Sequence, residues 1–304
     1  MFTGDEAAIL AAVRACGFTE LPDGAAIIPA SETVEMCDDP ATVFRRKKDT
    51  SMGVGLTLLK NGGGDAMVSA GSTGALLTGA TLITKRIHGI RRAAMAPVIP
   101  TATGSAVLID CGANAECTPE YLVQFAYLGN FYAQRVLGVA RPRVGLLNIG
   151  TEDSKGDRLR HEAFDLLKET KGINFIGNVE TRDVPYGCCD VLVADGFTGN
   201  IILKLYEGVA GAMMANIKNI FKKSSITMLA AMMVKGGLLG LKMRMDYSEF
   251  GGAPLLGVNG VVIKAHGSSD AKAIRNAIRQ AKTCAEKNIV GTIAQSVKEA
   301  ADAE

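Results

Sequence analysis

Short apolar runs alternate with longer amphipathic stretches along the chain. Most of the short runs are continuous Val, Ile, Leu and Ala, which is typical of strands buried on both faces. They predict strands at 25–29, 66–70, 95–99, 106–110, 144–149, 174–176, 191–194 and 261–264. The longer stretches predict helices at 40–60, 74–87, 119–137, 159–170, 200–221 and 271–287. This alternation indicates a three-layer α/β/α fold with a mostly parallel sheet between the helices.

Composition narrows the class of protein. The chain has 304 residues, of which 48% are hydrophobic and 21% charged, so it has the make-up of a folded globule and not of a disordered chain. No repeat or linker divides it, and we expect a single domain over 1–304 with a helical protrusion at 208–250. The net charge of +2 gives no general argument for nucleic-acid binding.

Cysteine and histidine spacing offers no metal site. The seven cysteines contain no C-x-x-C pair and the three histidines are far apart, so we expect no metal and reduced thiols in a cytosol. No run of eighteen uncharged apolar residues occurs, and a membrane-spanning helix is not expected.

The predicted strand ends are the most informative feature. Six of them run into small polar turns that contain glycine: 71–74, 111–114, 150–153, 177–180, 196–200 and 266–270. In an open α/β sheet such turns share one edge, and ligands bind beside it. The same residue types also cap helices, but six such ends favour an anion-binding crevice. Phosphate-loop, dinucleotide, G-x-S-x-G and H-E-x-x-H motifs are all missing, so no cofactor is expected.

The chain resembles the bacterial phosphate acyltransferase family of phospholipid synthesis (PlsX) in six motifs. They are SAGSTGA at 69–75, LIDCGAN at 108–114, VGLLNIGTEDSKG at 144–156, NFIGNVE at 174–180, DGFTGN at 195–200 and IKAHGSSD at 263–270. The resemblance implies transfer of a long fatty acyl group from acyl carrier protein to inorganic phosphate, giving acyl phosphate. It also implies a homodimer and a fold similar to phosphotransacetylase and the isocitrate/isopropylmalate dehydrogenases.

The amino terminus departs from the family pattern. Family members begin with a strand, an Asp-Ala-Met-Gly-Gly-Asp loop and a helix, whereas this sequence opens with Met-Phe-Thr-Gly-Asp, which looks like the end of the second strand. We expect one βα unit to be missing. Two other functions stay open: a short acyl-CoA:phosphate transferase like the phosphotransacetylases, and, if the amino-terminal loss is real, a non-catalytic scaffold at the membrane.

The implied chemistry suits these residues. Phosphate is already an anionic oxygen nucleophile, so the protein must hold it, orient it and stabilise the oxyanion. We predict that the phosphate is bound by Gly71, Ser72, Thr73, Gly74, Ser268, Ser269 and Lys204. The predicted catalytic residues are His266, which would move a proton, Asn114 and Asn200, which would orient the substrate or stabilise the oxyanion, and Asp195. His266 is alternatively a core or capping group, and Lys204 a solvated cation. Cys111 has no base nearby and is interpreted as structural.

Charge and methionine distribution suggest partners. Arg45, Arg46, Lys47 and Lys48 form a basic cluster that we expect to dock the acidic acyl carrier protein, although such runs are often solvated faces. Residues 208–245 contain six basic residues, no acidic residue and seven of the twelve methionines, a composition of interfacial helices. We therefore predict membrane contact through Leu238, Leu239 and Leu241, with a dimer interface as the alternative. We expect the protein to be cytoplasmic and peripherally associated with the membrane. A further expected partner is the membrane glycerol-3-phosphate acyltransferase.

Overall fold

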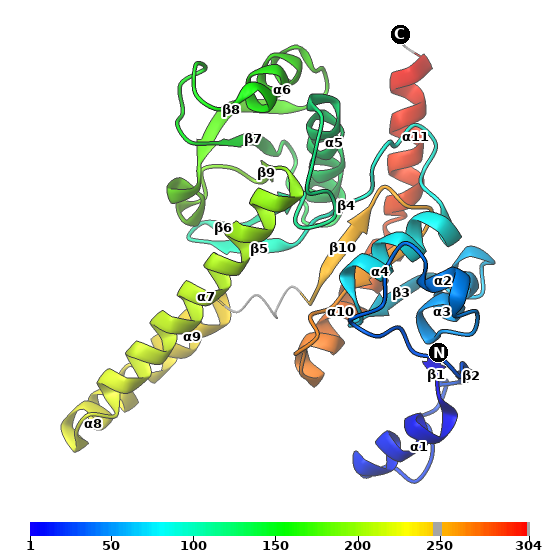
Figure 1. The fold of residues 1–304 in the computed structure, drawn as a ribbon. Coiled ribbons are helices and arrows are strands. Elements are labelled where there is room, and N and C mark those ends of the chain that lie inside the picture. The colour runs from blue at the N-terminus through cyan, green and yellow to red at the C-terminus, as the bar shows by residue number, and fades with distance from the viewer. Residues whose placement is uncertain (246–250, 303–304) are drawn as a thin grey trace. The chain divides into compact units, whose positions relative to one another are not determined.

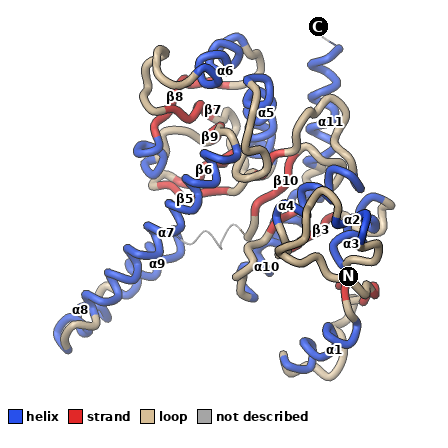
Figure 2. The backbone as a smooth tube through the Cα atoms, in the orientation of Figure 1, coloured by secondary structure: helices blue, strands red, loops and turns tan. Residues whose placement is uncertain are grey.

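The computed structural model describes residues 1–245 and 251–302. By contacts between Cα atoms the chain forms two compact units: unit 1 combines Met1–Ala93 with the segment from Gly252 onward, and unit 2 spans Ala94–Gly251. Figures 1 and 2 show the helices and strands of each unit. A single domain over 1–304 stays a prediction.

Unit 1 holds three strand pairs and a set of mostly short helices. Its strands are β1 (Phe2–Gly4), β2 (Ile27–Pro29), β3 (Ala66–Ser69), β10 (Ala253–Leu256) and β11 (Val261–Lys264). Its helices are α1 (Glu6–Ala15), α2 (Val43–Arg46), α3 (Ser51–Lys60), α4 (Thr73–Gly79) with a π-helical turn (Ala80–Thr84), α10 (Ala271–Glu286) and α11 (Ile289–Asp302). β1 pairs with β2 in parallel, β3 with β11 in parallel, and β10 with β11 antiparallel.

The core of unit 1 is built by α3 and α4 packing with strand residues. Leu56 and Leu76 are fully buried, beside Val262 of β11. Gly79 permits a close approach there, because a Cβ at this position would lie 2.7 Å from Leu56 Cδ1. This tight packing at the carboxyl end of α4 holds the helix against α3, and one of the predicted turns lies at the other end of α4.

Unit 2 contains six described strands, and all of them except β4 form a five-stranded sheet with helices on both faces. Its strands are β4 (Ala94–Met95), β5 (Val98–Thr101), β6 (Gly104–Ile109), β7 (Arg143–Asn148), β8 (Asn174–Glu180) and β9 (Val191–Val193). Its helices are α5 (Pro119–Arg135), α6 (Arg158–Glu169), a 3₁₀ helix (Thr181–Tyr186), α7 (Gly196–Phe221), α8 (Ser225–Met233) and α9 (Lys235–Met245). The sheet has the order β5-β6-β9-β7-β8, and its pairs are parallel except for β5 with β6.

Alternate side chains of the central strands face opposite helices. Leu108 and Leu192 belong to a buried cluster with Ile202 of α7. On the other face α5 lies so close that a Cβ on Gly129 would be 2.5 Å from Val191 Cγ1. Both faces of the sheet are thus covered, which confirms the predicted three-layer architecture with a parallel-dominated sheet.

Three helices form an arm that extends from unit 2. In Figures 1 and 2, α7 and α9 lie side by side and α8 closes the far end. The predicted protrusion at 208–250 includes residues 246–250, which lie outside the described residues. Within the part of the chain that the structure describes, no helix is long and apolar enough to cross a membrane.

Several boundaries differ from the sequence prediction. The single helix expected at 40–60 is wrong, because α2 ends at Arg46 and a new helix starts after Thr50, whose hydroxyl accepts a 3.0 Å hydrogen bond from Gly53 N–H. The turn expected at 177–180 is also wrong. Strand β8 continues to Glu180, because Asn178, Val179 and Glu180 pair in register with β7. The strand expected at 95–99 is divided between β4 and β5.

Candidate functional site

Two of the predicted turns lie at the same edge of unit 1. β3 and β11 are parallel neighbours with Ser69 opposite Lys264, and Ala265 N–H donates to Ser69 O at 2.9 Å. The turn at 71–74 therefore follows one strand directly beside the turn at 266–269, which follows the other. The structure places all the residues predicted to bind phosphate, except Lys204, at this edge, and His266 lies there as well.

The turn at 71–74 opens helix α4. Ser72 is buried, with 8% of its surface exposed, and its hydroxyl caps α4 by accepting from Ala75 N–H at 3.5 Å. Gly71 N–H donates to Ser69 Oγ at 3.2 Å. Gly74 is confined by Pro40, whose Cγ would be 3.0 Å from a Cβ added at Gly74. Ser72 therefore has a capping role, and Thr73 is the hydroxyl of this turn that does not cap the helix.

His266 is held in one neutral tautomer by its own turn. Ser268 N–H donates to His266 Nδ1 at 3.1 Å, and Ser268 Oγ lies 2.7 Å from the same nitrogen. A backbone N–H can only donate, so Nδ1 accepts and the ring proton is assigned to Nε2. His266 and Ser268 are both exposed, so Nε2–H is presented at the surface of the strand edge. The histidine is neither a core residue nor a helix cap.

In unit 2 the turn after β6 is organised by a buried carboxylate. Asp110 is fully buried and accepts from the backbone N–H groups of Met95, Cys111, Ala113 and Asn114 at 2.8, 2.7, 3.3 and 2.6 Å. It also accepts from Asn114 Nδ2 at 3.0 Å. Burial raises the pKa of Asp110 above its ordinary value, and the hydrogen bonds from Met95 and Asn114 oppose that rise. Asn114 is therefore fixed through both its backbone and its side chain.

The first turn of α7 lies against this Asp110 turn. Gly196 N–H donates to Asn114 O at 2.8 Å. A Cβ on Gly199 would lie 2.0 Å from Asp110 O, and one on Gly112 would lie 3.6 Å from Asn200 Oδ1. The approach at Gly199 requires a residue without a side chain, whereas the distance at Gly112 is an ordinary van der Waals contact. Asn114, Asp195 and Asn200, three of the predicted catalytic residues, are thus assembled at the adjoining ends of β6 and β9.

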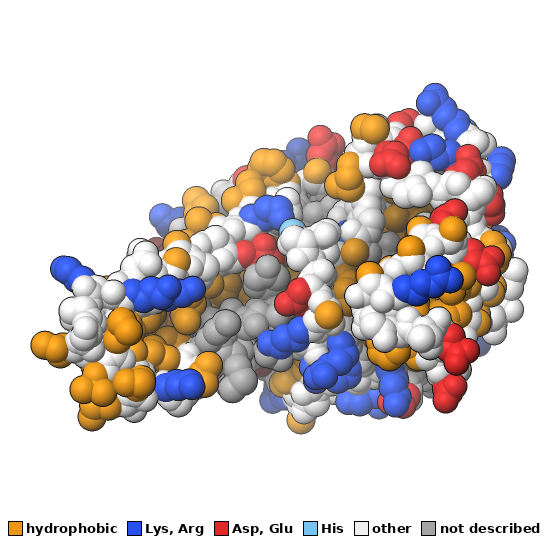
Figure 3. Space-filling model, turned by 90° about the horizontal axis from the view of Figure 1, so that it is seen from below, with side chains coloured by type: hydrophobic (Ala, Val, Ile, Leu, Met, Phe, Trp, Pro, Cys, Tyr) orange, Lys and Arg blue, Asp and Glu red, His pale blue; other side chains and the backbone are white. Residues whose placement is uncertain are grey.

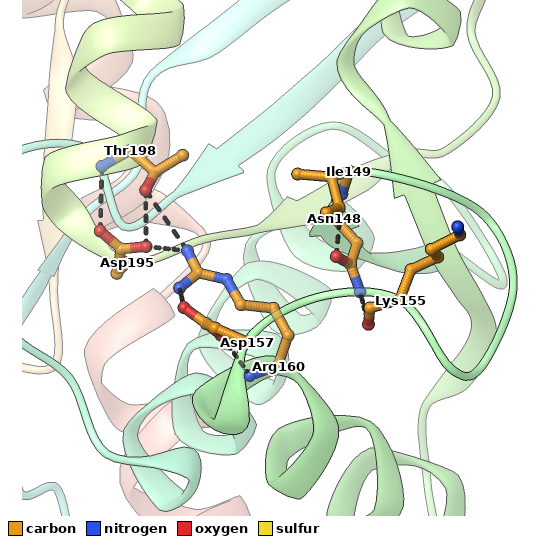
Figure 4. A network of polar contacts seen from close by, with 7 residues as sticks. All are labelled: Asn148, Ile149, Lys155, Asp157, Arg160, Asp195 and Thr198. Carbon is orange, nitrogen blue, oxygen red and sulfur yellow. Dashed lines mark hydrogen bonds and ion pairs between the residues drawn. The ribbon is translucent and has the colours of Figure 1, made fainter.

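Asp195 is tied into a polar network shown in Figure 4. It caps α7 by accepting from Thr198 N–H at 2.9 Å and Thr198 Oγ1 at 2.7 Å, and it forms an ion pair with Arg160. Burial alone would raise the pKa of Asp195, but the Thr198 hydrogen bonds and the Arg160 guanidinium outweigh it and hold the pKa below its ordinary value. Asp195 is consequently an ionised anchor of the helix start.

Sequence reasoning missed Arg160. Its guanidinium also donates to Asp157 Oδ2 at 2.9 Å, and its side chain is only 15% exposed. In the sequence it lies within the basic run Arg-Leu-Arg-His, which looks like a solvated helix face. The spacing from Asp157, the cap of α6, was the available signal, because residues three apart on a helix are neighbours.

A cleft of about 740 Å³ opens beside this network within unit 2. Polar residues and three aliphatic side chains line it. They are Leu147, Asn148, Ile149, Gly156, Asp157, Arg160, Glu180, Thr181, Thr198 and Ile202. Among its lining residues the carboxylates Asp157 and Glu180 outnumber the single cation Arg160, so the charge of this cleft does not favour an anion.

The remaining predicted residues lie elsewhere. Lys204 is exposed on α7, one turn beyond Asn200. Arg45, Arg46 and Lys48 are exposed at the end of α2, whereas Lys47 is half-buried and binds Asp38 at 2.6 Å and Thr33 O at 2.9 Å. The basic cluster therefore presents three cations, and Lys47 anchors the 33–38 loop. Among the described residues no group of three or more His, Cys, Asp and Glu side chains could hold a metal.

The family can be assigned from comparison with known proteins. The family described as fatty acid synthesis protein matches residues 1–291. The chain belongs to this family. It is 50% identical over 282 residues to a phosphate acyltransferase from Lysinibacillus sphaericus, covering 92% of this chain and 85% of the relative. It is 49% identical to the phosphate acyltransferase of Thermoanaerobacter pseudethanolicus, covering 91% and 83%.

Solved structures of other members of the wider fold are also similar. A phosphotransacetylase from Streptococcus pyogenes aligns with a TM-score of 0.62 at 18% identity, covering 92% of this chain and 84% of that one. The EutD phosphotransacetylase from Staphylococcus aureus aligns with a TM-score of 0.59 at 17% identity, covering 94% and 85%. At these identities the likeness concerns the fold, and it confirms the phosphotransacetylase-like fold predicted from sequence.

The state of Cys111 generates a prediction about covalent chemistry. Cys111 is 1% exposed, and burial, reinforced by the Asp110 charge, raises the pKa of its thiol to about 12. At neutral pH it is therefore a protonated, inaccessible thiol and a poor nucleophile. We expect Cys111→Ala to retain most activity, and no acyl adduct on Cys111 in intact-protein mass spectrometry. Iodoacetamide at pH 8 should label the exposed Cys16 and Cys37 first, which provides an internal control. A stoichiometric acyl group on Cys111 would overturn direct attack by phosphate.

Proposed function

We propose that this chain transfers a long-chain fatty acyl group from acyl carrier protein to inorganic phosphate. The observation that carries the proposal is the pair of turns at the adjoining ends of β3 and β11, which gather backbone amides, hydroxyls and a neutral histidine at one edge. Such groups hold an oxyanion without a metal or a cofactor. The names of the relatives agree with this chemistry.

The residues of both units have distinct proposed roles. In unit 1 the 71–74 turn, Ser268 and Ser269 would hold phosphate, and His266 Nε2–H would donate a hydrogen bond to a phosphate oxygen or to the leaving sulfur, which takes its proton from solvent. In unit 2 Asn114 and Asn200 would orient the thioester or donate to its oxyanion, while Asp195 holds the helix start. Lys204 would supply a cation near Asn200. A phosphate oxygen attacks the carbonyl carbon of the thioester. A C–O bond forms, the C–S bond breaks, and the thiolate leaves.

A short acyl-CoA donor is the second candidate, because the fold neighbours are phosphotransacetylases. The two are separated by one assay, in which the protein is incubated with phosphate and either palmitoyl-acyl carrier protein or acetyl-CoA. We expect palmitoyl phosphate from the first and no acetyl phosphate from the second. Acetyl phosphate formation alone would assign the short-chain reaction, and no product from either donor would contradict acyl transfer.

The phosphate turn can be tested at Thr73. Thr73→Val removes a hydroxyl that does not cap α4, and we expect the phosphate KM to rise or kcat to fall by about ten- to a thousandfold, the range for one oriented donor. Ser72→Val should give a comparable loss together with a lower melting temperature, because it also removes the cap. Unchanged steady-state kinetics in both variants would remove this turn from the site.

The exposed cations Arg45, Arg46 and Lys48 are proposed to dock acyl carrier protein, with Lys47 holding the loop behind them. A homodimer is also proposed, since large apolar side chains such as Met213 and Ile220 are 54% and 62% exposed on α7. Exposed apolar surface of this kind marks interaction sites. A membrane glycerol-3-phosphate acyltransferase would be the consumer of the product.

The arm is proposed to contact the membrane peripherally from a cytoplasmic location. Figure 3 shows apolar side chains gathered with Lys at the free end of the arm. Ile226 and Met233 of α8 are 80% and 83% exposed. The residues predicted to contact lipid are less exposed, since Leu239 and Leu241 have 49% and 40% of their surface accessible. Leu238 and Leu239 also line a groove of about 570 Å³ together with Phe221 of α7. Helix α8, with Ile226 and Met233, is therefore the better place to test lipid contact.

The membrane proposal predicts a defined loss of vesicle binding. Ile226→Glu with Met233→Glu should reduce sedimentation with anionic vesicles at least tenfold while leaving activity in solution intact. Binding by the parent should weaken with salt, because each basic residue near a charged bilayer contributes about 1 kcal/mol. The matched control, Ala7→Glu with Ala12→Glu on exposed positions of α1, should bind like the parent. Equal sedimentation of the α8 variant would show that the arm does not contact lipid.

A further inference from the structure

Arg160 joins the starts of two helices in unit 2. Asp157 caps α6 by accepting from Arg160 N–H at 2.9 Å, and Asp195 caps α7. The Arg160 guanidinium binds both caps, Asp157 through Nη1 and Asp195 through Nη2, and Nη2 also lies 3.3 Å from Thr198 Oγ1. Figure 4 shows the guanidinium between the two carboxylates. One planar group therefore fixes the separation of two helix ends that follow different strands.

The consequences extend from Asp195 to the candidate catalytic residues. Asp195 is followed directly by Gly196, whose N–H donates to Asn114 O at 2.8 Å. Asn200 lies one turn further along α7, beside Gly112. A shift of the first turn of α7 would therefore move Asn200 itself and break the hydrogen bond by which Gly196 joins α7 to Asn114.

The charge balance argues against a phosphate-binding role for Arg160. Its side chain is 15% exposed, and two carboxylates already neutralise its single charge. Three of its five N–H donors are used by Asp157, Asp195 and Thr198. A dianionic phosphate at this guanidinium would face two carboxylates, so the cation acts on the protein and not on the anion.

We propose that Arg160 is a positioning residue for the acyl transfer, which holds Asp195 and the first turn of α7 so that Asn200 and Asn114 meet the reacting thioester. The proposal rests on the proposed function. The planar fork of arginine suits this geometry, because it reaches two carboxylates and a hydroxyl at once, whereas an ammonium group on a flexible stem does not.

The ionisation of Asp195 gives the proposal a measurable pH signature. The groups that face Asp195 are Arg160 and Asp157 from α6, Thr198 from α7, Asp110 from the turn after β6, and Cys117 before α5. Arg160 and Thr198 lower the pKa of Asp195, while burial works to raise it. Without the guanidinium, burial is opposed by the Thr198 hydrogen bonds alone, so we expect the pKa of Asp195 to rise. If an ionised Asp195 holds the start of α7 for catalysis, the acid limb of kcat should move to higher pH.

The test compares Arg160→Met, Arg160→Lys and the control Arg158→Met. Arg158 lies on the same helix, but its side chain is 90% exposed and pairs with Glu162 in solvent. We expect Arg160→Met to lower kcat by about ten- to a hundredfold, the cost of small misplacements in a site, with the phosphate KM changed less than twofold. Arg160→Lys should fall between this variant and the parent, with the acid limb displaced less. Arg158→Met should behave like the parent.

Two results would overturn the proposal. A raised phosphate KM with unchanged kcat would make Arg160 a phosphate ligand, and a lowered melting temperature with unchanged kcat and pH profile would make it a purely structural residue. If Arg160→Met does not fold, the same criteria apply to Arg160→Lys.

Amide hydrogen exchange separates this proposal from the proposed function. We expect residues 196–200 to exchange at least tenfold faster in Arg160→Lys than in the parent and Arg158→Met. If the parent makes no acyl phosphate, the proposed function fails, while the exchange comparison still tests positioning. Unchanged exchange at 196–200 would overturn the positioning role whatever the activity.

Discussion

The site in unit 2 depends on one close approach, that of the first turn of α7 to the turn after β6. Backbone meets backbone there, because a Cβ on Gly196 would lie 2.6 Å from both Asn114 O and Asp110 Oδ2. The Asp110 carboxylate stabilises the same turn from inside by accepting five hydrogen bonds from N–H groups. A buried carboxyl that is costly to desolvate is retained where it satisfies several donors at once. The positions of Asn114 and Asn200 follow from this contact.

Much of this arrangement could be predicted from sequence, because strand–turn–helix junctions carry local signals. The predicted ends of β3, β6, β9 and β11 agree with the structure to within one residue, and their turns contain the glycine and small polar residues that are typical of such junctions. The turn at 177–180 failed because Gly177, at φ +92°, looks like a turn signal yet sits in a strand. Gly177 lies where the register between β7 and β8 shifts, and the pairing of Phe175 and Asn178 with β7 on either side of it is a long-range contact that no local pattern reveals.

The side-chain network was less accessible from sequence for the same reason. Arg160 and Asp195 are separated by 35 residues, and their ion pair exists only because β7 and β9 are neighbours in the sheet. Lys47 illustrates the opposite error. In sequence it belongs to a uniform run of four cations, but in the structure it alone is half-buried, against Asp38. The sequence therefore shows where basic residues are clustered, whereas burial in the structure shows which of them are accessible to another molecule and which are paired within the chain.

Asp110 and Asp195, which are buried in unit 2, are stabilised by different kinds of partner. The pKa of Asp195 in the folded protein lies below its ordinary value. Its negative charge therefore stabilises the fold at pH values above the pKa that Asp195 has in the unfolded chain. This stabilisation is lost as the pH falls through the lower pKa of the folded state. The pKa of Asp110 is raised by burial, so its ionisation opposes folding as pH rises above the unfolded value. Asp195 has a cation and a hydroxyl partner, whereas Asp110 has N–H dipoles alone. The stronger partners belong to the helix start that carries Asn200, and the weaker ones to a turn already held by packing.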